Sequence, residues 1–342
     1  MKHTSPVGIS ILLLMLIAPR IVADADIRIV FINAWSGLTY SGTFRVGRYE
    51  TADEAAFRYG ILVRQIEKLE PDVVIVNEAN PLPAYAKKLS RDLDMGFVYA
   101  IRAGGVRLGP VGFPFNLREG DVVLIKEPLT IKYLGNRDIL GGASGNVGSF
   151  TLKETTHLLL TRIVAGATEV EIVVTRWTDT EPATRENLDQ LASLYTDGAL
   201  TPEEYLSRVH NAVEGNNRRI AEAEATLAII EEFAEDSQII LAGSLHAVPG
   251  SRPIEMLLEA GFVDAFGTTT EAYTRDGERN SIRRTYFPPV DGGMVERTRV
   301  DYLLVRGDRL SVSSREIAFD DATFDTHPSD HFGLVVDIAI RE

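Results

Sequence analysis

Polar side chains that can do acid–base or metal chemistry stand at the ends of several apolar runs in this sequence. In the clearest case, Gln238 to Ser251, four apolar residues lead into Gly243 and a turn that carries Ser244 and His246. An apolar run closed by a glycine turn predicts a buried strand that presents side chains at its C-terminal end. Carboxylates and amides gathered at such ends can bind a hard divalent cation, and an imidazole there can move a proton. The other residues of this kind are Asn33, Glu78, Asp301, Asp330 and His331.

Each of these residues also has an ordinary structural interpretation. A lone Asn33 or Asp330 can cap a turn, and Glu78 can form a surface ion pair. Asp301 can pair with a neighbouring arginine, and His246 can be a partly buried polar residue that is hydrogen-bonded within its turn. Residue types alone therefore do not decide between catalytic and structural roles.

Alternating strand and helix patterns position these side chains. Ile27 to Asn33 and Val73 to Val76 are β-branched, apolar runs, and Ala52 to Leu69 between them has a helical period. A strand–helix–strand order with polar residues at each strand end is typical of an α/β layered fold. Further strands are predicted at 97–102, 121–125, 158–164, 170–175, 299–305 and 334–340.

The middle of the sequence is predicted to be helical. Thr201 to Glu204 forms a capping box with proline at the first helical position, and a second helix is expected to follow Asn216 and Asn217. The glycine-rich stretches 104–116 and 141–146 are expected to be loops. No linker or repeat divides the chain, so residues 26–342 are predicted to be one domain with a helical insertion at about 178–216.

The N-terminal residues have the features of a targeting segment. Lys2 and His3 precede an apolar stretch from Ile9 to Ile17, and Ala23-Asp24-Ala25 fits a cleavage site. We expect residues 1–25 to be a signal peptide and the mature protein, without a transmembrane span, to be secreted or periplasmic. The alternative is an uncleaved segment that tethers the protein to the membrane.

Composition limits the partners. The 342 residues are 45% hydrophobic and include no cysteine, which indicates a large core that needs no disulfide framework. The formal net charge is −14, and no cluster of Lys and Arg compensates for it. Long nucleic acid is therefore disfavoured as a ligand.

Five pieces of the sequence, taken in order, resemble the endonuclease/exonuclease/phosphatase family. They are FINAWSG, PDVVIVNEAN, GDVVLIKEPL, RVDYLLVRGD and PSDHFGLVVDI. The resemblance extends from about Ile27 to Ile340, and it implies a four-layer α/β sandwich of two mixed β-sheets flanked by helices. It also implies a phosphoesterase that depends on Mg²⁺ (or Mn²⁺) and hydrolyses a phosphodiester or phosphomonoester. Given the acidic charge and the expected export, we expect a small or phospholipid-type phosphorylated substrate.

The resemblance implies a role for each matching residue. Glu78 would be the principal Mg²⁺ ligand, with Asn33 beside it. Asp330 and His331 would form an acid–base pair, in which the carboxylate fixes the imidazole tautomer and the ring takes a proton from the attacking water. Asp301 would support the site from the neighbouring strand.

Three positions depart from the family pattern. Where the family has Gly-Asp-Phe-Asn, this sequence has Ser244 in place of Asp and His246 in place of Asn. The family's Asn-Thr-His aligns with Thr175-Arg176-Trp177, so Trp177 replaces a phosphate-contacting histidine. The loss of one positioned donor or base typically lowers a rate by about 10²–10⁴-fold.

These departures leave two hypotheses, of which we favour the first on the sequence and keep the second as the alternative. In the first, the site is rebuilt: His246 acts as phosphate donor or second base, Arg176 supplies positive charge, and Ser244 contacts substrate. In the second, the scaffold is kept and hydrolysis is lost, which leaves a secreted binding protein. Strand alternation sends either Arg176 or Trp177 into the site, and we expect an inward Arg176 to favour the first hypothesis and an inward Trp177 the second. A serine hydrolase is disfavoured, since Ser244 lacks the G-x-S-x-G turn.

Overall fold

The computed structural model describes residues 25–41, 45–108, 111–146, 149–165, 168–234, 238–267, 269, 272–289 and 295–341 of the chain. The signal peptide predicted for residues 1–25 thus lies outside the described residues, except for Ala25, which begins the first strand. Among the helices in these ranges, none is long and apolar enough to cross a membrane.

The first of two six-stranded sheets has the order β13-β14-β1-β2-β4-β3. At its centre, β1 pairs with β2 in parallel and with β14 antiparallel. Its strands are β1 (Ala25–Asn33), β2 (Val73–Ala79), β3 (Gly96–Leu108), β4 (Val111–Ile125), β13 (Leu310–Ala318) and β14 (Gly333–Ile340).

The second sheet has the order β5-β6-β7-β8-β12-β9. Here β7 and β8 run parallel, and β12 is antiparallel to β8. Its strands are β5 (Thr130–Asn146), β6 (Ser149–Ala165), β7 (Thr168–Arg176), β8 (Gln238–Ser244), β12 (Asp301–Arg306) and β9 (Val263–Asp264); a two-stranded ribbon joins β10 (Arg275–Asp276) to β11 (Arg297–Thr298).

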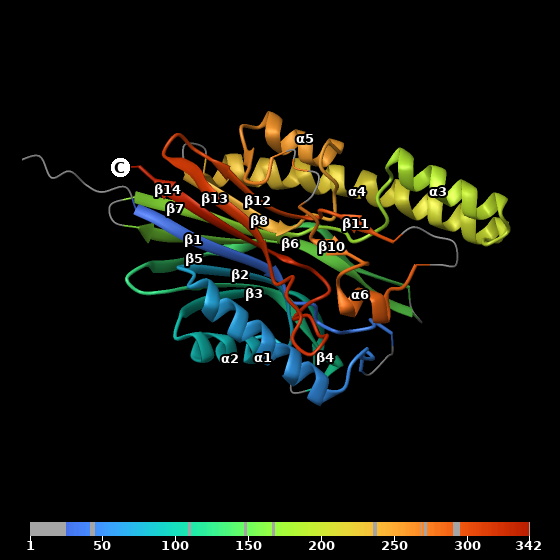
Figure 1. Cartoon of the computed structure of the whole chain (residues 1–342), viewed down its shortest axis with the longest axis horizontal. Coiled ribbons are helices and arrows are strands. Elements are labelled where there is room, and N and C mark those ends of the chain that lie inside the picture. Colours follow the sequence, from blue (N-terminus) through green and yellow to red (C-terminus); the bar gives the residue numbers. More distant parts are fainter. Residues whose placement is uncertain are drawn as a thin grey trace, which may run out of the picture.

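Helices cover the outer face of each sheet, so the molecule has four layers (Figure 1). Helices α1 (Ala52–Leu69) and α2 (Ala84–Leu93) lie on the first sheet, and α4 (Pro202–Ala234) and α5 (Arg252–Glu259) lie on the second. The remaining helices are α3 (Arg185–Thr196), which runs beside α4, and α6 (Ser281–Tyr286). The four-layer α/β sandwich predicted from the sequence is confirmed.

The main core lies between the two sheets. Ile29 and Ile75 of the first sheet and Ile172 and Ile240 of the second are fully buried members of it. One further apolar cluster lies between each sheet and the helices on its outer face. Since burial of such a side chain contributes about 1.5–3 kcal/mol, the facing apolar sides of the strands are what hold the sheets together.

Two local predictions are wrong. The stretches 104–116 and 141–146 belong largely to strands: β3 and β4 run together as a long hairpin, and β5 continues to Asn146. No second helix begins after Asn216, because this residue lies within α4, a single helix of 33 residues. Gly215 lies against the loop after β7, where an added Cβ atom would be 1.7 Å from Thr180 Oγ1. The glycine thus serves close packing and does not end the helix.

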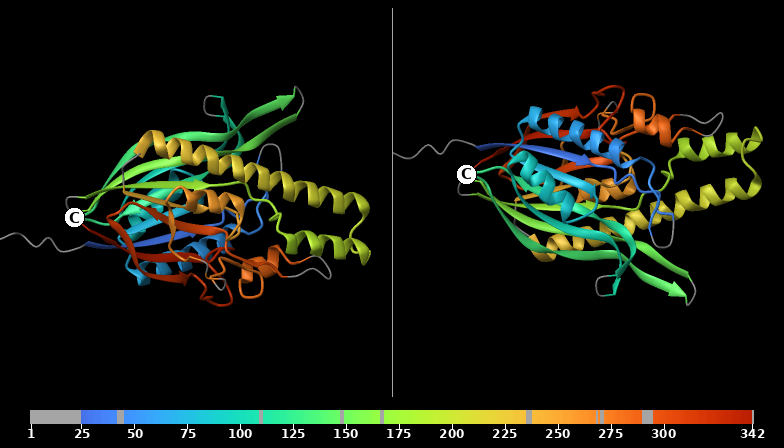
Figure 2. Two further views of the ribbon diagram at one scale, coloured as in Figure 1. Left: turned by 90° about the horizontal axis from the view of Figure 1, so that it is seen from above. Right: turned by 90° about the horizontal axis from the view of Figure 1, so that it is seen from below.

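The helical segment projects beyond the sheets. Helix α3 and the first half of α4 form an arm that extends past the body of the molecule (Figure 2). The capping box expected at Thr201 is present, with Glu204 Oε2 accepting from the Thr201 backbone N–H at 2.8 Å and Thr201 Oγ1 accepting from Glu204 N at 3.2 Å. This cap fixes where α4 begins.

Gly60 in the middle of α1 is a site where a side chain is expected to stabilise the fold. An added Cβ atom would meet only the tip of Arg64, at 3.4 Å, so Gly60→Ala should raise the free energy of unfolding by about 0.5–1 kcal/mol. Urea denaturation measures the change. The control is Gly250→Ala, where space is open but φ is +77°, and there we expect a loss of about 1–2 kcal/mol.

Candidate active site

Strand register brings the predicted polar residues to one edge of the two facing sheets. Asn33 at the end of β1 stands beside Asn77 of β2. In the second sheet, Ser244 at the end of β8 stands between Arg176 of β7 and Asp301 of β12. Ends of adjacent strands are where α/β sheets gather ligand-binding groups, and five of these side chains meet here from both sheets.

A set of hydrogen bonds, which we call the inter-sheet clasp (Asn33, Asn77, Ser244 and Asp301), joins the sheets at this edge. Ser244 Oγ donates to Asp301 Oδ1 at 2.6 Å and accepts from Asn33 Nδ2 at 3.2 Å. The backbone N–H of Ser244 donates to Asn77 Oδ1 at 2.9 Å. All four residues are fully buried. The Ser244 hydroxyl, which replaces the family's aspartate, is therefore engaged in hydrogen bonds that connect the two sheets.

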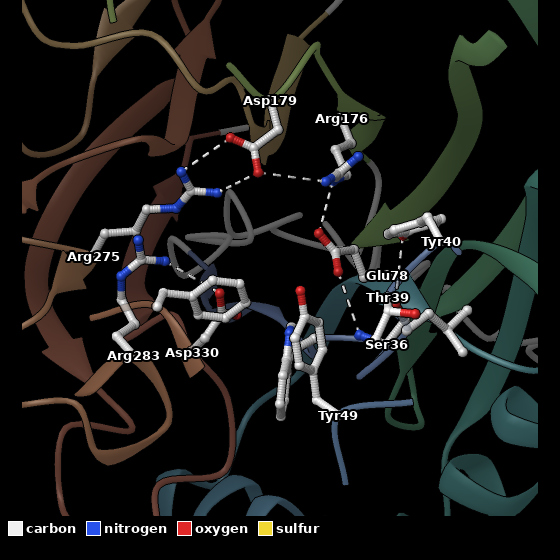
Figure 3. Close-up of a pocket in the computed structure, with 13 residues that line it drawn as sticks. Ser36, Thr39, Tyr40, Tyr49, Glu78, Arg176, Asp179, Arg275, Arg283 and Asp330 are labelled. Atoms are coloured by element: carbon white, nitrogen blue, oxygen red, sulfur yellow. Dashed lines mark hydrogen bonds and ion pairs between the residues drawn. The ribbon is translucent and has the colours of Figure 1, made fainter. Parts of the chain in front are cut away.

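Glu78 lies next to the clasp, with both carboxylate oxygens in use. Oε1 accepts from Asn33 Nδ2 at 2.9 Å and lies 2.8 Å from Arg176 Nε, and Oε2 accepts from the Ser36 backbone N–H at 3.3 Å (Figure 3). Burial raises the pKa of Glu78, but Arg176 and Asn33 outweigh it and bring the pKa to about 2. Glu78 is thus a carboxylate whose charge is already balanced by a buried guanidinium.

The residues expected to bind Mg²⁺ do not fit a metal in this arrangement. Asn33 turns its amide N–H toward Glu78, and its oxygen accepts from the Trp35 backbone N–H at 2.9 Å. Mg²⁺ needs oxygen ligands in near-octahedral geometry, whereas the Arg176 guanidinium lies where a cation would meet Glu78. Across the residues that the structure describes, no group of three or more His, Cys, Asp or Glu side chains is placed to hold a metal ion.

His331 has a different carboxylate partner from the one predicted. Its Nδ1 lies 2.7 Å from Asp301 Oδ2, whereas Asp330 Oδ1 is 4.0 Å from Nε2. Asp330 instead receives a hydrogen bond from Arg283 at 3.3 Å. The predicted Asp330–His331 pair is therefore wrong, because adjacent residues turn their side chains to different neighbours. Burial raises the pKa of Asp301, but His331 and Ser244 outweigh this and lower it.

Arg275 connects His331 to a carboxylate that the sequence analysis missed, Asp179. The guanidinium donates from Nη1 and Nη2 to the two oxygens of Asp179 at 3.0 and 2.7 Å, and from Nε to His331 Nε2 at 3.0 Å. Burial raises the pKa of Asp179, but the Arg275 guanidinium outweighs this and holds the pKa well below 3.8. The nitrogen of His331 that faces away from Asp301 is thus covered by a donor.

His246 is buried behind this pair. Its Nδ1 lies 3.3 Å from Asp179 Oδ1, and within the described ranges neither ring nitrogen has a hydrogen bond. Its ring stands perpendicular to that of His331, with 6.1 Å between centroids. Burial lowers the pKa of His246 well below 6.5. Asp179 raises this pKa, but the positive charges of Arg275 and Arg176 lower it and add to the effect of burial. The ring is therefore neutral in the folded protein.

The neutral state of His246 predicts a loss of stability in acid. Because the folded pKa lies below the unfolded value of 6.5, the unfolded chain binds the proton more readily, and stability falls as pH drops below about 6.5. His246→Asn should remove this contribution, which is up to about 1.4 kcal/mol per pH unit. Asparagine also suits the backbone here, where φ is +49°.

Urea denaturation of both proteins between pH 5 and 8 measures the effect. The difference between the two free energies should be constant above about pH 6.5 and should shift in favour of His246→Asn below it. A pH-independent difference would contradict the assignment of a neutral, buried imidazole.

Arg176 points into the site and Trp177 points away from it. Arg176 is 5% exposed and meets Glu78, while Trp177 is 1% exposed and packs in the core between the second sheet and its helices. The alternative in which Trp177 faces the site and contacts substrate is therefore wrong, since consecutive strand residues face opposite sides and the outer side is covered by α4 and α5. An inward Arg176 was expected to favour a rebuilt enzyme, but its pairing with Glu78 commits the guanidinium to an internal partner.

A cavity of about 240 Å³ opens in front of these residues. One side of it carries three ion pairs. In each pair a guanidinium and a carboxylate lie side by side, and Figure 3 shows them as a row around the opening. The pairs are Arg176–Glu78, Arg275–Asp179 and Arg283–Asp330.

Aromatic side chains form another part of the lining. Trp35, Tyr49 and Phe287 face the cavity, and Tyr286 packs behind them. The Trp35 and Tyr49 rings are stacked with 5.9 Å between centroids, and Phe287 lies 5.4 Å from Tyr49 with its edge toward the ring. Tyr49 is 39% exposed, so this wall is accessible from solvent.

Arg58 of α1 fixes the loop that carries Trp35. It donates hydrogen bonds to the backbone carbonyls of Ala34, Trp35 and Pro328 at 2.7–3.0 Å and pairs with Glu50. The guanidinium also lies over the Trp35 ring, 4.9 Å from its centroid. The aromatic wall is therefore held in place by buried charge-assisted bonds.

The sequence analysis missed three charged residues of the cavity: Asp179, Arg275 and Arg283. Asp179 follows the end of β7 by three positions, so a search for polar residues just beyond the strand ends would have reached it. Arg275 and Arg283 lie in a segment with only the two-residue strand β10 and the short helix α6, where no periodic signal marks them. Only the tertiary fold brings them to Asp179 and Asp330.

Comparison with known proteins gives a consistent result. The profile of the Endonuclease/Exonuclease/phosphatase family matches residues 31–331. The structure of D. rerio TDP2 with a single-stranded DNA product covers 92% of this chain and 99% of that one, with 16% identity and a TM-score of 0.60. An endonuclease/exonuclease/phosphatase from Bacteroides vulgatus covers 93% and 100%, with 15% identity and a TM-score of 0.59. No curated protein matches the sequence.

Proposed function

Because the chain belongs to the endonuclease/exonuclease/phosphatase family, whose members generally hydrolyse phosphoester bonds, we propose that it binds a small ligand without metal-assisted hydrolysis. In this proposal the protein keeps the binding pocket of the family and has lost phosphoester hydrolysis. This is the second of the two hypotheses raised by the sequence. The observation that carries it is the buried ion pair between Arg176 and Glu78.

Arg176 takes over the charge balance that a metal ion would give Glu78, but not its chemistry. A guanidinium is permanently charged and neutralises the carboxylate at 2.8 Å. It has no open coordination position at which to bind water or a phosphoryl oxygen, which is how a metal generates a nucleophile and stabilises developing charge. The pair therefore supports a site in which the charge of Glu78 is balanced without a metal ion.

The groups that would activate water are also engaged elsewhere. Ser244 stands where the family has an aspartate that orients the nucleophile, and it has no carboxylate for this task. Its hydroxyl donates a hydrogen bond to Asp301. The lone pair on His331 Nε2, which a general base would use, accepts from Arg275 Nε. His246 is neutral and 1% exposed. Among the described residues, neither histidine therefore offers an exposed, free lone pair to a water molecule in the cavity.

The proposed ligand is small and is met outside the cytoplasm. The cavity volume of about 240 Å³ supports a small molecule, and the net charge of −14 disfavours long nucleic acid. The signal-like features of residues 1–25 support export, with a membrane-tethered form as the alternative.

A phosphoesterase is the second candidate function. The observation in its favour is the Asp301–His331 contact at 2.7 Å, which is the geometry of a carboxylate that orients an imidazole. Such activity would require Arg275 to leave His331 Nε2 when substrate binds. The phosphate would then meet Arg275 and Arg176, which are suited to it in geometry and charge.

Turnover measurements on the mature protein test the proposal. Phosphodiester and phosphomonoester substrates are incubated with Mg²⁺, with Mn²⁺ and with chelator, and a His331→Ala variant is assayed alongside. We expect no turnover above that of the variant, and no increase in Tm on addition of either metal. Metal-dependent turnover that disappears in the variant would overturn the proposal. Turnover that survives chelation and is lost in the variant would establish the second candidate.

A further inference from the structure

The charges that line the cavity cancel within the described part of the chain. Three guanidinium groups and three carboxylates face it, each guanidinium beside a carboxylate. A phosphate group would have to draw a guanidinium away from its partner and leave a carboxylate unpaired. The cavity is therefore not built around a free anion.

Each ion pair presents a hydrogen-bond acceptor next to a donor. A carboxylate only accepts and a guanidinium only donates, whereas a hydroxyl group does both. Asp179 is 35% exposed on its side chain, so its oxygens can be reached from the cavity. Ser36, Thr39 and Tyr40 add hydroxyl groups to the lining. This set suits a ligand with several hydroxyl groups along one edge.

The side of the cavity opposite the three ion pairs carries aromatic side chains. In Figure 3, Tyr49 lies across the cavity from Asp179, and Trp35 and Phe287 line the cavity with it. An aromatic face packs against C–H groups and contributes stabilisation by excluding water. A ligand that fits both walls has one apolar face and a polar edge.

The volume of the cavity indicates the size of ligand that it can hold. A cavity of about 240 Å³ holds about eight water molecules at roughly 30 Å³ each. That is room for a single six-membered ring with its substituents. The ion pairs, the aromatic side chains and the volume of the cavity favour the same class of ligand.

We propose that the cavity binds one uncharged sugar ring, with its hydroxyl groups on the Arg–carboxylate pairs and its C–H face on Tyr49. This inference rests on the proposed function and names its ligand class. Tyr49 is then a specificity residue that contacts the sugar, while Arg58 positions the neighbouring Trp35.

Ligand-observed NMR on the mature protein tests the inference. The probes are the methyl pyranosides of glucose, galactose, mannose and N-acetylglucosamine at millimolar concentration, with inorganic phosphate and the corresponding sugar phosphates as competitors. We expect at least one methyl glycoside to bind and phosphate not to displace it. Tyr49→Ala should weaken binding at least about tenfold. Tyr195→Ala on α3, which removes a similarly exposed tyrosine outside the cavity lining, should leave binding unchanged.

The outcomes separate this inference from the proposed function. If the sugar phosphates or phosphate bind and the glycosides do not, the sugar inference falls, but a non-hydrolytic binding protein remains. If a phosphate ester is bound and hydrolysed, both fall. Absence of binding by every glycoside also overturns the inference. Equal affinity of the two tyrosine variants, with unchanged thermal unfolding, would show that binding occurs elsewhere and would overturn it too.

Discussion

Replacing Arg176 with methionine is expected to lower the free energy of unfolding by about 3–5 kcal/mol at neutral pH. The guanidinium is buried against Glu78 at 2.8 Å, and its removal leaves an uncompensated carboxylate in the interior. The loss should shrink in acid, because Glu78 is ionised down to about pH 2 only while Arg176 is present. Without the guanidinium, the buried carboxylate takes up a proton at higher pH and the penalty disappears.

Urea denaturation of Arg176→Met, Glu78→Gln and the double variant measures the interaction as a double-mutant cycle. The double variant should recover most of the stability, since it leaves no buried charge unpaired. If Arg176→Met alone costs less than about 1 kcal/mol, the buried pair that carries the proposed function is not present in solution.

Gly243→Ala is expected to cost about 3 kcal/mol or more. An added Cβ atom would lie 1.9 Å from the backbone oxygen of Thr175, on the neighbouring strand β7. The obstacle is main chain held in a parallel ladder, so it cannot rotate away as a flexible side chain can. Separation of β7 and β8 would also displace Ser244 from its position beside Arg176.

Gly60→Ala is the matched control, since the same methyl group is added where only the tip of Arg64 is near. Thermal and urea unfolding of both variants give the comparison. A loss of less than about 1 kcal/mol at Gly243 would mean that the strands can separate and that this close approach is not required.

The fold was predictable where apolar periodicity is strong. Ala52–Leu69 is α1 as predicted, and the strand before Ser244 and the hairpin of β6 and β7 have the expected apolar patterns. Prediction failed where glycine has a meaning that sequence does not reveal. Residues 141–146 continue a strand, and Gly215 allows α4 to pack against Thr180. The partner that explains Gly215 is 35 residues away in sequence, whereas residues 141–146 pair with the nearby start of β6.

The site was predictable as far as strand ends define it. Asn33, Glu78, Ser244 and Asp301 are brought together because register and layer order place adjacent strand ends at one edge. The pairing of charges was not predictable. Which carboxylate meets His331, and whether Arg176 meets Glu78 or a ligand, depend on side-chain directions that tertiary packing decides.

The position of β1 has a consequence for how the chain is made. This strand lies between β2 and β14, and the Arg28–Asp337 ion pair on it joins residues 309 positions apart. A ribosome that adds about 5–20 residues per second exposes the apolar faces of β1 and β2 for on the order of tens of seconds before β14 exists. The first sheet, and with it the edge that holds the cavity, closes only after synthesis of its last strand. Until then the nascent chain offers chaperones an open hydrophobic surface, and folding is governed by the slow closure of a loop nearly as long as the protein.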